Sequence, residues 1–156
     1  MDIALARALH VLAVIHWIGG LSFVTLVVLP FAKARPTTRQ ALEAFESVEQ
    51  RFSAQARVSI PLAGISGLWL TDRMDLWPRF HEPRFWWMSG MLGLWIFFML
   101  MLFVLEPLLR ERFARKAKQA PEAVFRRMSR LHQVLLLLSA LTVLGAVAGS
   151  HGLLLF

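Results

Sequence analysis

Long stretches of apolar residues limit what this chain can fold into more than any other feature. A transmembrane helix needs about 20 mostly apolar residues. Residues 3–32 carry a single charge, Arg7, and residues 85–105 carry none. In residues 131–156 histidine is the one ionisable side chain. Soluble domains do not bury several helices of this kind, so the sequence predicts an integral membrane protein.

A fourth stretch is weaker than the other three. Its uncharged core, residues 58–70, is short and contains Pro61. It reaches membrane length only if the helix begins near Ser53 and the side chain of Arg57 extends to the interface. We count it because the two basic connections of the chain can lie on the same side of the membrane only if the chain crosses here. The prediction is one domain, an all-α membrane bundle of four helices at about 3–32, 53–72, 85–106 and 131–155.

The positive charges gather in two connections of this bundle. Most of the 17 Lys and Arg residues lie between the first and second spans or between the third and fourth. The positive-inside rule then places these connections in the cytoplasm and both termini outside. Anionic lipid headgroups account for the net charge of +7, so we expect the lipid bilayer and no nucleic acid as partner. The expected location is a bacterial-type inner (cytoplasmic) membrane, crossed several times.

The first cytoplasmic connection is itself predicted to be helical. Thr37 and Gln40 fit a capping box. Four apolar residues then recur near helical spacing: Leu42, Phe45, Val48 and Phe52. We expect an amphipathic helix at about 38–52 that lies at the interface and runs into the second span. Small residues in all four spans, including Gly145 and Gly149, favour close helix contacts and leave room for a homo-oligomer.

The histidines are informative because membrane interiors admit ionisable groups reluctantly. At about 1.5 Å per residue, His10 lies about 10 Å below the outer end of the first span, and His151 about 8 Å below that of the last. Because these spans run in opposite directions, we expect the two imidazoles at one depth. Two imidazoles on facing helices are what a bis-histidine haem b requires, and a bundle core supplies an apolar slot.

Other residues fit a haem at this level. Arg7 precedes His10 by about one helical turn and could reach a propionate, while Arg84 or Arg79 could serve the other. Trp17 follows His10 on the same face and could pack on the ring. His16 lies deeper, where it either serves a second haem or hydrogen-bonds across helices. His81 lies in the outer connection, as a ligand or as a solvated loop residue.

A bare copper site is the alternative to haem. His10, His81 and His151 would converge at the outer end and bind the metal through imidazole. The methionines lie mainly in the third span without a tight repeat, so we expect them to fill the core. Cysteine is absent, which excludes disulfides, thiol catalysis and cysteine-held iron–sulfur clusters. His132, at the cytoplasmic end of the last span, is expected only to hydrogen-bond.

Two segments resemble a known superfamily. Leu9-His10-Val11-Leu12 followed by Trp17-Ile18-Gly19-Gly20 resembles the opening helix of the copper-resistance D (CopD) family and of HemJ, the haem-associated protoporphyrinogen oxidase of bacteria. Glu49-Gln50-Arg51-Phe52, Pro61 and Gly67-Leu68-Trp69-Leu70 are similar to the second helix of HemJ and its approach. The resemblance implies a four-helix membrane fold with haem b or a copper connection, and His10 as the ligand. HemJ-like proteins carry a lysine early in the third helix, and residues 85–90 contain none, which argues against protoporphyrinogen oxidation.

The sequence therefore predicts a small membrane cytochrome b that moves electrons between quinone or a cytoplasmic donor and an outer partner such as a cytochrome c. The alternatives are a CopD-like copper-binding, transport or tolerance protein, and a structural subunit without a cofactor. Whether the chain is a haem-dependent oxidoreductase or the electron-transfer subunit of one stays open. The candidate cofactor-binding residues are His10, His151, His16, His81, Arg7, Trp17 and Arg84, with His10 and His151 as metal ligands.

Overall fold

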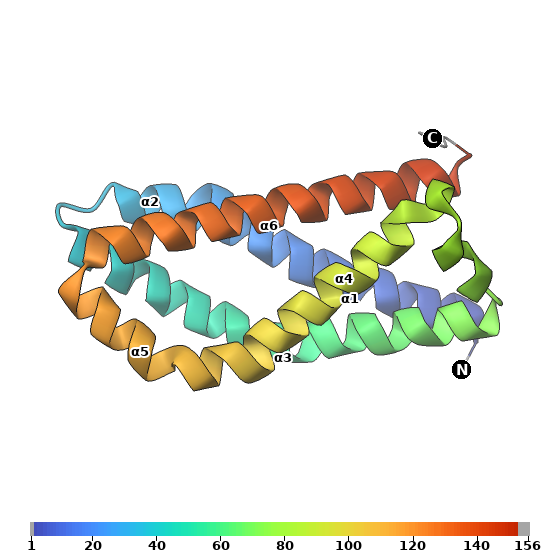
Figure 1. Cartoon of the computed structure of the whole chain (residues 1–156), viewed down its shortest axis with the longest axis horizontal. Helices are drawn as coiled ribbons and strands as arrows, with labels where there is room; N and C mark the ends of the chain where they lie inside the picture. The colour runs from blue at the N-terminus through green and yellow to red at the C-terminus, as the bar shows by residue number, and fades with distance from the viewer. Residues whose placement is uncertain (1, 153–156) are drawn as a thin grey trace.

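The computed structural model describes residues 2–152, in which no strand occurs, so the all-α prediction is confirmed (Figure 1). The helices are α1 (Ile3–Phe23), α2 (Leu29–Lys33), α3 (Thr38–Arg73), α4 (Trp86–Leu100), α5 (Glu106–Gln119) and α6 (Pro121–Ser150). The short segments between them are η1 (Val24–Val28), η2 (Trp77–His81), η3 (Pro83–Phe85) and η4 (Met101–Leu105). The last span was predicted to continue to 155, but α6 ends at Ser150 and residues 151–152 form a turn, while residues 153–155 lie outside the described part of the chain.

Three helical segments within residues 2–152 are long and apolar enough to cross a membrane. They are Ile3–Lys33, Pro83–Gln119 and Pro121–Ser150. The chain is therefore a multi-pass membrane protein by the length and composition of its helices. Helix α3 has 36 residues but is not among the three, because charged side chains occupy much of its first half.

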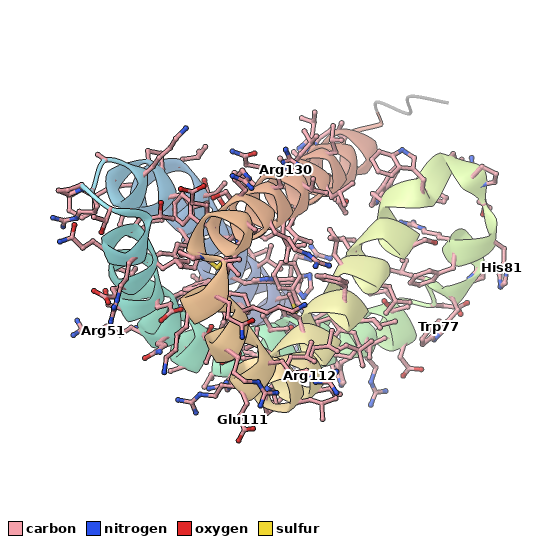
Figure 2. All side chains as sticks on the ribbon, turned by 60° about the vertical axis from the view of Figure 1, so that its left-hand side comes forward. Arg51, Trp77, His81, Glu111, Arg112 and Arg130 are labelled. Carbon is pink, nitrogen blue, oxygen red and sulfur yellow. The ribbon has the colours of Figure 1, made fainter. Side chains whose placement is uncertain are left out.

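Both termini lie at one end of the molecule, together with η2 and η3 (Figure 1). The α2–α3 and α5–α6 connections lie at the opposite end. Figure 2 shows Trp77 and His81 at the first end, well separated from Arg51 and Arg112. The helices thus run back and forth along one long axis, and the basic connections share one end.

Two proline residues explain why the long apolar helices are irregular. Proline lacks a backbone N–H and its ring collides with the carbonyl four residues earlier. Pro30 follows the π-helical segment η1 closely, and Pro107 follows η4 in the same way. A π-helical turn widens the backbone, so each proline is accommodated without ending the helix.

Helix α3 joins the predicted amphipathic helix and the predicted second span without a break. The Oγ1 of Thr37 accepts a hydrogen bond from the backbone N–H of Gln40 at 3.3 Å, so this half of the predicted capping box is confirmed. The last span and the short helix expected before it are likewise one continuous helix, α6. Each of these two helices therefore begins with a polar segment and continues into an apolar one.

Within residues 2–152, helices α1 and α3 have the most extensive contact of any two helices, and aromatic rings lie between several of the helices. The Nε1 of Trp95 on α4 donates to the carbonyl oxygen of Ile60 on α3 at 3.0 Å. A Cβ added at Gly64 would lie 2.0 Å from this indole. On α6, Gly145 faces the ring of Trp86 and Gly149 faces the ring of Trp87. Glycine is needed at these points because the neighbouring ring occupies the space of a side chain.

Large apolar side chains also cover the outside of the molecule. Leu12, Leu26 and Leu137 expose 63%, 64% and 59% of their surface. Soluble monomers rarely present a contiguous apolar exterior of this extent. The outward faces of α1, η1 and α6 therefore have the character of surfaces solvated by lipid tails.

Candidate functional site

His10 lies on α1 and its imidazole faces α3. Its Nδ1 is 2.8 Å from the carbonyl oxygen of Ala63 and 3.2 Å from the Oγ of Ser66. A carbonyl oxygen can only accept, so Nδ1 carries the proton. The lone pair of a neutral ring then resides on Nε2. This arrangement, with one ring nitrogen donating to a carbonyl, is typical of histidines that bind metal through the other nitrogen.

The position of this ring depends on Gly67. A Cβ at Gly67 would lie 2.9 Å from Cε1 and 3.2 Å from Nδ1 of His10. Contacts under 3.0 Å force a neighbour to move, and the imidazole is held by its hydrogen bond. Gly67, which belongs to the HemJ-like segment of the sequence, thus has a specific partner.

His151 follows the last residue of α6 and is exposed. Its Nδ1 lies 2.8 Å from the carbonyl oxygen of Val147 and 3.2 Å from the Oγ of Ser150. The same reasoning places the proton on Nδ1 and leaves Nε2 as the acceptor. Among the described residues, no hydrogen bond, ion pair or ring contact joins His151 to His10, and each ring is held by its own support.

Arg7 and Trp17 accompany His10 on α1, as the sequence predicted from their spacing. The Nη2 of Arg7 lies 3.6 Å from the Sδ of Met74, which follows α3. Trp17 is buried, and its ring meets that of Phe98 edge-on at 5.0 Å between centroids. The Nε1 of Trp17 is buried without a hydrogen-bond partner. Trp17 is therefore a core residue whose N–H could still serve a polar atom of a ligand.

His16 lies outside that core, in a groove between α1 and α3. Its Nε2 is 3.2 Å from the Oε1 of Gln55, so the Gln55 oxygen accepts from this nitrogen. The groove has a volume of about 450 Å³. It is lined by Ile15, His16, Gly19, Gly20, Phe23, Val24, Val48, Arg51, Phe52 and Gln55. It is mostly apolar, with a few polar groups at one side, as sites for small amphipathic molecules are.

His81 and Arg84 lie in the connection before α4. His81 is exposed at the end of η2, where Figure 2 shows it at the edge of the molecule. Arg84 forms an ion pair with Glu82 and lies over the ring of Phe85. Arg79 lies over the same ring, 4.9 Å from its centroid. Both arginines therefore contact residues that are close to them in the sequence.

A second group of polar residues comes together in a way that was not predicted from the sequence. Glu49 on α3 lies 3.7 Å from His132 on α6, between Oε1 and Nε2. Arg57 pairs with Glu106 at 2.9 Å. One signal could have revealed Glu49, because it follows Phe45 by four residues and therefore lies on the apolar face of the helix. No comparable signal in the sequence links it to His132.

No three His, Cys, Asp or Glu side chains come together closely enough to hold a metal ion in residues 2–152. The placement of His10, His81 and His151 therefore gives no support to the predicted copper site. A haem with two axial imidazoles needs no such cluster, because the porphyrin nitrogens supply the other four ligands.

Comparisons with known proteins add little to this description. No protein-family model matches the chain. A protein of Aquifex aeolicus (strain VF5), described as an uncharacterized protein, is 41% identical over 61 residues. The match covers 38% of this chain and 41% of that relative, so it spans less than half of the relative's length. No solved structure matches.

Proposed function

We propose that the chain is a four-helix protein of a bacterial cytoplasmic membrane that binds haem b and transfers electrons. In this proposal the second half of α3 is the fourth span, both termini face the outside, and His10 and His151 are the axial ligands. Haem b supplies one-electron chemistry when bound. The protein contributes ligation, orientation and exclusion of water.

One observation carries the proposal. Both His10 and His151 donate a hydrogen bond from Nδ1 to a backbone carbonyl at 2.8 Å, and both keep Nε2 as an acceptor. This is the tautomer that an iron ligand requires, and the hydrogen bond orients the ring before the metal binds. His10 lies near the start of α1 and His151 directly follows α6, and the start of α1 and the end of α6 lie at the same end of the molecule (Figure 1).

The surroundings of His10 are apolar, as a haem ligand requires. Ala13, Trp17 and Ala63 are buried around the contact of α1 and α3. Arg7 offers a cation one turn from His10, and its contact with Met74 is weak enough to exchange for a propionate. A bare copper ion would need further close ligands, which the described residues do not assemble.

The groove beside His16 fits the proposed exchange of electrons with quinone. It is open rather than enclosed, and two of its apolar lining residues, Ile15 and Phe23, are exposed on the outside of the molecule. His16 and Gln55 place hydrogen-bonding groups against its apolar wall, and Arg51 adds a cation. The carbonyl oxygens of a quinone headgroup could accept hydrogen bonds from the amide N–H₂ of Gln55 and the guanidinium of Arg51, since the N–H of His16 is already donated to Gln55.

The test is a reduced-minus-oxidised spectrum of the purified protein, with metal analysis of the same sample. We expect a haem b spectrum that is lost in His10→Ala and His151→Ala. His81→Ala is the matched control, since this exposed histidine makes no described contact, and its spectrum should stay unchanged. Copper without haem would instead support the alternative function. Absence of both pigment and metal would leave only a structural subunit.

A further inference from the structure

An acid and an imidazole face each other between α3 and α6, away from the proposed haem ligands. The Oε1 of Glu49 lies 3.7 Å from the Nε2 of His132. The ring of Phe45 meets the imidazole edge-on, 5.3 Å away between centroids, and covers one side of the pair. Phe45 is fully buried, which fixes the position of the imidazole. The pair therefore lies on the packed side of both helices.

The tautomer of His132 determines what this pair can bind. Its Nδ1 lies 3.0 Å from the carbonyl oxygen of Met128, which can only accept a hydrogen bond. Nδ1 therefore carries a proton, and in the neutral ring Nε2 presents a lone pair toward Glu49. An ionised Glu49 likewise presents only lone pairs. Two acceptors facing each other repel, and a single added proton on either group converts the contact into an attraction.

We propose that Glu49 and His132 form a binding site for one proton, shared between α3 and α6, that exchanges with water at the basic end of the molecule. The geometry permits exchange because the side chain of Glu49 keeps 35% of its surface accessible, against 13% for His132. A proton can thus reach Glu49 first and then redistribute within the pair. This proposal does not depend on whether the protein binds haem.

The charges around the pair favour a bound proton. Glu46 lies on the same helix, and Glu106 approaches from the start of α5, where Arg57 holds it at 2.9 Å. From α1 no charge opposes them, because no Lys, Arg, Asp or Glu occurs between Arg7 and Lys33. Burial is the largest cause, and together with the carboxylates of Glu106 and Glu46 it raises the pKa of Glu49 to about 7. The site therefore gains and loses its proton near neutral pH.

Infrared spectroscopy can observe this proton directly, because a carboxylic acid and a carboxylate absorb at different frequencies. The full chain is purified in a detergent without ester or carboxyl groups, and spectra are recorded from pH 5 to pH 9. We expect one carboxylic-acid band with a midpoint near pH 7. The band should vanish in Glu49→Gln and persist in Glu43→Gln, where the replaced side chain is 61% exposed and paired with Arg39.

The role of His132 is tested by His132→Gln. The amide N–H₂ of the new side chain donates to the carboxylate, so the midpoint of the Glu49 band should fall by about one pH unit or more. An unchanged midpoint in His132→Gln would show that the proton belongs to Glu49 alone and overturn the shared site. A wild-type protein without a carboxylic-acid band between pH 6 and pH 8 would overturn it as well, whatever the variants do.

Discussion

The Nδ1 of His10 on α1 lies 2.8 Å from the carbonyl oxygen of Ala63 on α3, so a side-chain hydrogen bond joins the two helices. The same carbonyl accepts a hydrogen bond from the Oγ of Ser66 at 3.1 Å, and this hydroxyl lies 3.2 Å from the imidazole. Inside a membrane an imidazole without such a partner would be costly. The contact thus anchors α1 on α3 and aims the Nε2 of His10.

The first prediction concerns the space beside this imidazole. In Gly67→Ala the added Cβ would lie 2.9 Å from Cε1 of His10, so the ring must leave its position. We expect a loss of about 1–3 kcal/mol in the free energy of unfolding, and a weakened haem spectrum. Gly93→Ala is the control, since a Cβ there meets nothing within 4 Å. Equal stability of the two variants in detergent unfolding would contradict the described packing.

The second prediction separates packing within the chain from contact between chains. Gly149 lies against the ring of Trp87, and a Cβ there would come within 2.1 Å of the ring. Gly149→Ala should therefore lower the stability of the folded chain by about 1–3 kcal/mol. Gly19→Ala, which places a Cβ in open space, should not. Light scattering and thermal unfolding measure the two effects. If Gly149→Ala changed the oligomer size without lowering the stability, Gly149 would serve contact between chains, and the prediction would be wrong.

The third prediction is a dependence of stability on pH. The pKa of Glu49 is raised from 4.5 to about 7, so between these values the folded chain holds more protons than the unfolded chain. The free energy of unfolding should therefore fall as the pH rises from about 4.5 to about 7. The loss should be on the order of 1 kcal/mol, reduced by solvent because 35% of the side chain is accessible.

Unfolding of the wild type and of Glu49→Gln at pH 5 and pH 8 measures this effect. The variant cannot ionise at position 49, so it should lose less stability than the wild type between the two pH values. Parallel losses in both proteins, or a wild type that becomes more stable as the pH rises, would contradict the raised pKa of Glu49.

The fourth prediction concerns the neighbour of the proton site. The carboxylate of Glu106 contributes to the raised pKa of Glu49, after burial. In Glu106→Gln this negative charge is absent, so the midpoint of the Glu49 carboxylic-acid band should move to lower pH. It should stay above the ordinary value because burial persists. Glu111→Gln, on the exposed face of α5, should leave the midpoint unchanged.

Parts of the candidate site followed from the sequence, and parts did not. Helical spacing placed Arg7, His10 and Trp17 near one another on the first helix, and all three make contacts with other helices. The expected meeting of His10 with His151 stays a prediction. Arg84, which was expected at a propionate, pairs with Glu82 in this structure, and no periodic pattern in the sequence predicts that contact.

What the sequence determined by itself is the all-helical fold and the presence of apolar stretches long enough to cross a membrane. The length of the apolar stretches, the cap at Thr37 and the distribution of Lys and Arg are local properties, because each depends on neighbours along the chain. Tertiary structure decided which helix faces which residue. A period of 3.6 residues shows that Glu49 shares a face with Phe45, but only the packing of α6 brings His132 opposite that face. The partner of a side chain depends on the rotation and register of two helices, which lie far apart in sequence.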